Sequence, residues 1–178
     1  TAAGITEWYL VRTGLGSSEI RDFVVFDENG RFENIGGWDV DASLEQKKGK
    51  CGLHPVSGGY ELCWGVGSYG DHQYTAMYLI TDAVDILDDA ACFHYQLVSP
   101  GLSQRPRHVR AKVEVRDTPL DSTNVRFWGF GYEGSTYIED GAVCFESGGR
   151  FGRSSSIISL IRLDKEFFSG GNRRNVCF

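Results

Sequence analysis

Hydrophobic and polar residues alternate most regularly in HVRAKVEVRD, residues 108–117. Side chains of an extended strand point alternately to its two faces, so one face of this segment is apolar and the other is charged. This pattern is typical of an antiparallel strand with one face on the core and one in water. We expect the apolar residues of the strand to be buried and the charged residues between them to be exposed. The apolar set is Val109, Ala111, Val113 and Val115.

Other short segments of apolar and aromatic residues follow one another along the chain, separated by turn signals. The chain holds 23 glycines against four prolines, which favours tight turns between short strands over long helices. The predicted strands are 5–12, 60–66, 74–80, 92–98, 124–132, 135–146 (with a break at Gly141) and 155–163. Two further segments, 42–48 and 81–91, are predicted as short helices. The fold class that results is all-β, a single-domain antiparallel β-sandwich or barrel over residues 1–178 with at most one or two short helices.

One hairpin is predicted in EIRDFVVFDENGRFENIGGW, residues 19–38. A three-residue loop that ends at Gly30 pairs Asp27 with Arg31 and Phe26 with Phe32, so that apolar residues face apolar ones.

A second hairpin is predicted in CGLHPVSGGYELC, residues 51–63. A turn centred on Ser57 places Cys51 opposite Cys63, close enough for a disulfide bond. Such a bond indicates an oxidising compartment, so we predict a secreted, disulfide-containing protein. The five cysteines include no C-x-x-C pair, which argues against a structural zinc site.

Charge and hydropathy narrow the classes of partner. The formal net charge is −6, which opposes general binding to nucleic acid or to anionic lipid, although RPRHVR (105–110) is a local basic patch. No apolar run approaches the length of a membrane span. The chain begins at TAAGITEW without a charged and apolar leader, so we expect that any targeting segment has been removed.

Two loop segments carry the candidate binding residues. Trp38 and Asp39 lie beside glycines and acidic residues, and Tyr69, Asp71 and His72 lie in the Gly-rich segment that follows the second hairpin. Loops that are anchored on a rigid scaffold often carry binding residues. We expect these five side chains to be accessible to solvent and to contact a partner.

The strand VRFWGFGYEG, residues 125–134, offers another set of aromatic residues. Trp128, Phe130 and Tyr132 share one face, and Gly129 and Gly131 leave room on the other for a close neighbour. Such a line of rings can stack on a sugar or a nucleobase, or anchor a protein partner. We expect it to belong to the core, because an exposed aromatic stripe lowers solubility.

These observations predict a secreted binding protein, lectin-, toxin- or effector-like, that recognises a carbohydrate or a host protein surface. We expect binding and not catalysis, with no cofactor and no metal. The segment DVDASLE (39–45) starts like a calcium loop but lacks its glycine and its final glutamate, so we expect an acidic loop in which Ser43 caps a short helix. The aspartates of 81–91 form a solvated cluster.

Two alternatives remain. One is a small secreted ribonuclease in which His72 and His108 act as acid and base beside Arg105 and Arg107. The other is a barrel that encloses an apolar ligand. His94 lies between aromatic residues on a predicted strand, and we expect it to be packed. The oligomeric state is open.

Overall fold

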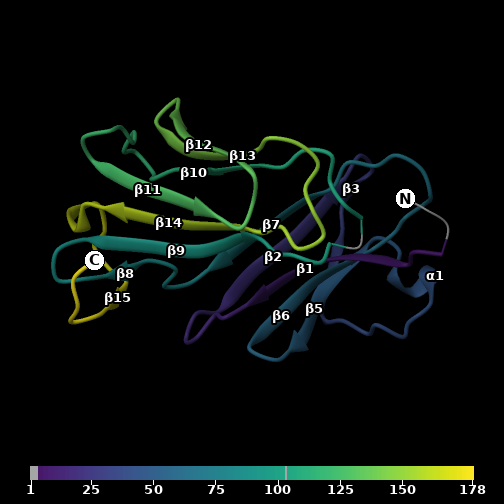
Figure 1. The fold of residues 1–178 in the computed structure, drawn as a ribbon. Helices are drawn as coiled ribbons and strands as arrows, with labels where there is room; N and C mark the ends of the chain where they lie inside the picture. The colour runs from purple at the N-terminus through teal and green to yellow at the C-terminus, as the bar shows by residue number, and fades with distance from the viewer. Residues whose placement is uncertain (1–3, 103) are drawn as a thin grey trace. The chain divides into compact units, whose positions relative to one another are not determined.

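The computed structural model describes residues 4–102 and 104–178. The chain divides into two compact units, Thr1–Thr81 and Asp82–Phe178, in which the regular secondary structure is almost entirely short β-strands (Figure 1). Within the described ranges, helical structure is confined to α1 (Leu44–Lys47) and the 3₁₀ helix η1 (Lys165–Phe167). The prediction of an all-β fold with at most two short helices is confirmed. A single domain over residues 1–178 stays a prediction.

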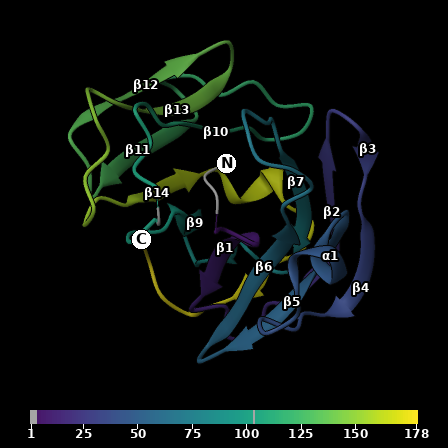
Figure 2. The ribbon, with the colours of Figure 1, turned by 90° about the vertical axis from the view of Figure 1, so that its right-hand side faces the viewer.

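The first unit contains two sheets (Figure 2). Its strands are β1 (Glu7–Thr13), β2 (Ile20–Asp27), β3 (Gly30–Arg31), β4 (Glu33–Gly37), β5 (Lys50–Val56), β6 (Gly59–Gly65) and β7 (Thr75–Ile80). One sheet has the order β1-β6-β5-β4 and the other β3-β2-β7. Neighbouring strands are antiparallel except β4, which runs parallel to β5.

The apolar faces of these two sheets form one buried cluster. Phe23 and Val25 of β2 meet Leu62 and Trp64 of β6, and Phe32 is buried where the chain passes from β3 in one sheet to β4 in the other. Successive side chains of a strand point to opposite faces, so residues two positions apart, such as Phe23 and Val25, lie on the same side. The first unit is therefore a β-sandwich with an aromatic core.

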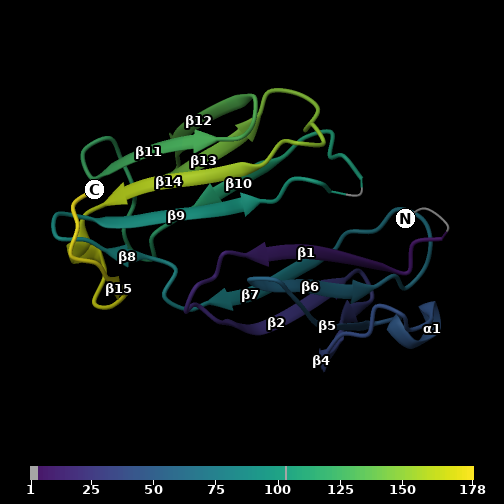
Figure 3. The ribbon, with the colours of Figure 1, turned by 60° about the horizontal axis from the view of Figure 1, so that its bottom comes forward.

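The second unit also contains two sheets (Figure 3). Its strands are β8 (Asp85–Ile86), β9 (Ala91–Val98), β10 (Arg110–Val113), β11 (Val125–Phe130), β12 (Gly134–Glu139), β13 (Ala142–Ser147), β14 (Ile157–Leu163) and β15 (Asn172–Arg173). The orders are β11-β14-β9-β8-β15 and β10-β13-β12. Among the described residues all four sheets of the chain are open, so the structure does not contain the closed barrel of the apolar-ligand alternative.

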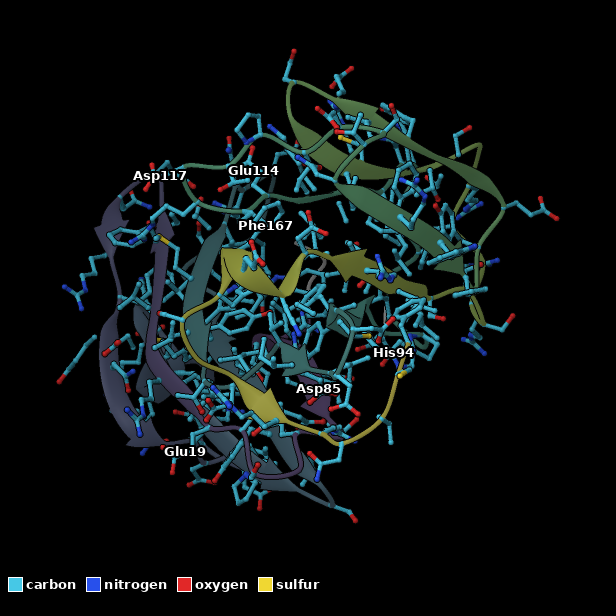
Figure 4. The ribbon with its side chains drawn as sticks, turned by 90° about the vertical axis from the view of Figure 1, so that its left-hand side faces the viewer. Glu19, Asp85, His94, Glu114, Asp117 and Phe167 are labelled. Atoms are coloured by element: carbon cyan, nitrogen blue, oxygen red, sulfur yellow. The ribbon has the colours of Figure 1, made fainter. Side chains whose placement is uncertain are left out.

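Strand β14 carries much of the second core. Ile157, Ile161 and Leu163 are buried on one face and pack with Val143 and Phe145 of β13 in the other sheet. Figure 4 labels Phe167 on η1, which packs partly buried against the same cluster. In the part of the chain that the structure describes, no helix has the length and the apolar character that a membrane span requires.

The hairpin of β12 and β13 closes through a two-residue turn. Asp140 and Gly141 both have positive φ, +50° and +74°, and Glu139 pairs with Ala142. Positive φ at both positions matches the twist of the strands, and an Asp-Gly pair adopts it readily. The predicted break of 135–146 at Gly141 is confirmed.

The regular strand 108–117 faces as predicted. Its charged residues Arg110, Lys112 and Glu114 are exposed, while its four apolar residues pack against the second core. They are half-buried and not fully buried, because β10 is an edge strand of its sheet.

The disulfide predicted between Cys51 and Cys63 is wrong. Cys51 lies opposite Trp64, and Cys63 lies opposite Gly52, because the turn has two residues and is not centred on Ser57. This one-residue difference places the two thiols on opposite faces of the sheet, where no bond can form. All five cysteines, which lie within the described ranges, are free thiols.

Two other local predictions are corrected. In the first hairpin Asp27 pairs with Gly30 and Phe26 with Arg31, so its loop has two residues instead of three. Segment 81–91 is not helical: it contains β8 and turns, with Asp82 at a φ of +49°. Pairing of β8 with β9 supplies backbone hydrogen bonds that a short helix would have to make within itself.

Candidate functional site

Trp38, predicted to be an exposed contact residue, is buried. Its side chain is 6% exposed, and its indole Nε1 donates to Glu7 Oε2 at 2.6 Å. The expectation of an accessible indole is therefore wrong. The neighbouring Asp39 is exposed, and its Oδ1 accepts a hydrogen bond from the Asp41 backbone N–H within a tight turn.

The segment after Trp38 is held in place by the side chain of Lys47. The Lys47 side chain is 3% exposed, and its Nζ lies 3.0 Å from Glu7 Oε2 and donates to the Val40 carbonyl at 2.6 Å. Ser43 caps α1, as its place in the sequence predicts, with Gln46 completing a capping box. A buried ion pair of this kind is stable only when its remaining hydrogen bonds are satisfied. The site around Trp38 is therefore structural.

The other predicted loop residues lie between β6 and β7. Tyr69 is 46% exposed and Asp71 is exposed, in agreement with the prediction. The His72 side chain is only 10% exposed, so the expectation that it is accessible is wrong. Its ring also lies against Tyr74, with ring centroids 5.9 Å apart. This loop is therefore anchored through His72, while Tyr69 and Asp71 face solvent.

His72 is held between two polar side chains. Its Nδ1 is hydrogen-bonded to the Glu28 carboxylate at the tip of the β2–β3 hairpin, and its Nε2 lies 3.1 Å from Ser68 Oγ. A hydrogen bond from its own backbone N–H, followed by the bond to His72, lowers the pKa of Glu28. Glu28 and Ser68 were not among the residues predicted from the sequence. Ser68 lies four positions before His72 in the same loop, whereas Glu28 lies 44 positions away and reaches His72 because β2 pairs with β7.

His108 belongs to the second unit and has its own carboxylate partner. Its Nε2 lies 2.9 Å from Glu146 Oε1, and Tyr137 also donates to Glu146. The bonds from Tyr137 and then from His108 lower the pKa of Glu146. Arg110 pairs with Glu139 on the same charged face. The histidines of the ribonuclease alternative thus each have a local acidic partner.

The second unit also exposes large aromatic side chains. Trp128 and Phe130 on β11 are 42% and 48% exposed. Their neighbours across the sheet are Leu160 and Ile158 of β14, followed by His94 and Gln96 of β9. We call this side of β11, β14 and β9 the aromatic face. Figure 4 labels His94, which is exposed and not packed as its position between aromatic residues predicted.

The prediction that the aromatic strand belongs to the core is therefore wrong for two of its three rings. Gly129, on the opposite side, has no room for a side chain: a Cβ there would lie 2.5 Å from Thr136 Oγ1. The face with the glycine is thus the one that packs closely. Tyr132 turns inward beyond the strand, and its hydroxyl bonds Thr136. The spacing of Trp128 and Phe130 in the sequence predicted that the two rings share one side of the strand. It did not predict that this side meets solvent.

Two features lie beside Trp128. Phe178 stacks on its ring, with centroids 5.7 Å apart and an interplanar angle of 23°. A hollow of about 460 Å³ lies along the edge strand β11, lined by Ser122, Val125, Arg126, Phe127, Trp128 and Ile138. The Arg126 guanidinium is held there by the carbonyls of Ser122 and Val125. The edge of the aromatic face is therefore concave and carries a cation.

Among the described residues no group of histidine, cysteine and acidic side chains has the arrangement of a metal site. Asp85 and Asp89 of the acidic cluster instead pair with Arg174 and Arg162. Comparison with family models, with curated proteins and with solved structures finds no match to this chain.

Proposed function

We propose that this protein is a binding protein whose aromatic face recognises a carbohydrate. The observation that carries the proposal is the pair of exposed rings, Trp128 and Phe130, two positions apart on one strand. Residues at this spacing point the same way and lie about 7 Å apart along the strand. They offer two ring surfaces in a row on a sheet that is already ordered.

A sugar ring fits such a surface for two reasons. Its C–H face is apolar and packs flat on an aromatic ring, while its hydroxyl groups, at the edge, seek hydrogen-bond partners. Polar partners flank the rings here: His94 and Gln96 lie on the same face, and Arg126 lies beside Trp128. These side chains stand on hydrogen-bonded strands and are already ordered before binding. Binding therefore costs little conformational entropy.

The charge of the chain also supports this choice. A net charge of −6 disfavours nucleic acid, the other common ligand of aromatic sheet faces. An extracellular, lectin-like role agrees with a carbohydrate ligand. The prediction of secretion rested on a Cys51–Cys63 disulfide, and both cysteines are free thiols. Secretion therefore stays a prediction without that support.

The test is a binding screen against a glycan array and against insoluble cellulose and chitin. Among the four tryptophans, all of which lie in the described ranges, Trp128 is in the exposed class and Trp8 is half-buried, so the emission lost in Trp128→Ala identifies the signal from this face. We expect a bound saccharide to shift the emission. Trp128→Ala should weaken binding at least tenfold, which corresponds to about 1.4 kcal/mol.

The matched control is Tyr60→Ala, an aromatic residue of the first unit that is 37% exposed. This variant should bind as the wild type does, and both variants should keep the melting temperature. If no saccharide binds, or if Trp128→Ala and Tyr60→Ala bind with equal affinity, carbohydrate recognition by this face is wrong.

A further inference from the structure

Ser68, His72 and Glu28 have the connectivity of a serine nucleophile, its base and the carboxylate that orients the base. Ser68 Oγ lies 3.1 Å from His72 Nε2, and the other ring nitrogen is bonded to Glu28. Ser68 itself is exposed, whereas His72 is almost fully covered. The hydroxyl is thus accessible to a substrate while its partner is held in place.

The carboxylate decides which nitrogen of His72 carries the proton. An ionised carboxylate can only accept, so Nδ1 is the N–H that donates to Glu28. Nε2 then keeps its lone pair and accepts the hydroxyl hydrogen of Ser68. This is the protonation state in which a histidine can take a proton from serine, and the same roles occur on unrelated folds.

A hollow of about 380 Å³ adjoins Ser68. Two cationic residues, Arg31 and Lys48, line it together with Phe32, and the Asp27 carboxylate at its wall accepts hydrogen bonds from Asn29. The cations can bind a negatively charged group of a substrate whose carbonyl lies at Ser68. The hollow therefore favours an ester of a small acid that carries a second, anionic group.

We propose that the first unit hydrolyses such esters, with Ser68 as nucleophile, His72 as general base and acid, and Glu28 as a positioning residue. Ser68 Oγ bonds to the carbonyl carbon while His72 Nε2 takes its proton. The C–O bond to the alcohol then breaks, and the alcohol leaves with that proton. Water adds to the acyl-serine, gives its proton to Nε2, and releases the acid. The proton on Nε2 returns to Ser68.

The experiment compares two chromogenic esters, 4-nitrophenyl acetate and 4-nitrophenyl hydrogen succinate, with the full chain. We expect a burst of nitrophenolate, and a succinyl group on the peptide that contains Ser68 by mass spectrometry. Ser68→Ala should lower kcat/KM at least 100-fold. Ser57→Ala, in an exposed turn, is the matched serine control and should react as the wild type does. Cys177→Ser removes the exposed thiol as a source of background acylation.

Two further variants separate the roles. Glu28→Gln should lower kcat at least tenfold with both KM and the melting temperature unchanged. The unchanged melting temperature distinguishes a loss of positioning from a loss of folded protein. Arg31→Gln should raise KM for the succinyl ester and not for the acetyl ester. Equal rates for wild type and Ser68→Ala, or absence of an acyl group on Ser68, would overturn the proposal. Because it concerns the first unit, its failure leaves carbohydrate binding by Trp128 and Phe130 unaffected.

Discussion

At the scale of single residues, Cys63 illustrates how the environment decides chemistry. The side chain is 1% exposed, and the charges of the Glu7–Lys47 ion pair, from β1 and α1, act on it. Burial, and after it the Glu7 carboxylate, raises the pKa of the Cys63 thiol to about 12. The thiol is therefore neutral over the physiological range, and a neutral thiol is a poor nucleophile.

We predict that Cys63 in the native protein resists alkylation at pH 8, whereas the exposed Cys177 reacts quickly. The measurement is peptide mapping after treatment with N-ethylmaleimide, with and without guanidinium. Modification of Cys63 as fast as Cys177 in the native protein would contradict this environment.

The thiol of Cys63 in the folded protein holds its proton more tightly than an ordinary thiol of pKa 9.0. The protonated Cys63 thiol therefore adds to the free energy of unfolding below pH 9.0, and this addition is lost as the pH rises toward 12.

Residue types alone could not separate Trp38 from Trp128. Both lie near glycines, yet Trp38 is 6% exposed and Trp128 is 42% exposed. The difference comes from partners that are distant in sequence: Glu7 accepts the Trp38 N–H from a strand 31 positions away. The candidate list from the sequence was therefore correct about the exposure of Asp39, Tyr69 and Asp71 and wrong about the exposure of Trp38 and His72.

At the scale of elements, close approach between α1 and β6 depends on a glycine. A Cβ on Gly65 would lie 1.9 Å from the Lys47 backbone carbonyl oxygen. We predict that Gly65→Ala lowers the free energy of unfolding by about 3 kcal/mol, because backbone must move to admit the methyl group. Gly37→Ala in β4 is the matched control, since a Cβ there meets open space. Chemical denaturation measures both, and equal stability of the two variants would mean that α1 does not pack on β6.

Strand existence was predicted much better than strand register. Each predicted strand segment overlaps an observed strand, because alternation is a property of neighbouring residues. Register depends on the number of residues in the turn, and both predicted hairpins differ from the structure by one position. One position exchanges the two faces of a strand, which is why the Cys51–Cys63 bond failed while β5 and β6 were recognised.

At the scale of the whole molecule, each unit has its own buried cluster. We predict that residues 82–178, expressed alone, fold to a β-rich state that unfolds cooperatively, since the second core is formed within this range. Circular dichroism and thermal unfolding of fragments 1–81 and 82–178 test this. If both fragments lack a cooperative transition, the chain is one domain over residues 1–178, as the sequence predicts.

The sequence by itself determined the all-β class, the positions of most strands, the Asp140–Gly141 turn and the capping of α1 by Ser43. These features arise from interactions between residues a few positions apart, which the pattern of residue types records directly. Only the tertiary structure decided which face of β11 meets solvent and which side chains surround His72. Either face of an aromatic strand can be the buried one, and Glu28 reaches His72 from 44 positions away in the sequence. The exposed face of β11 and the neighbours of His72 both depend on how distant segments pack together. A pattern of neighbouring residues in the sequence does not record that packing.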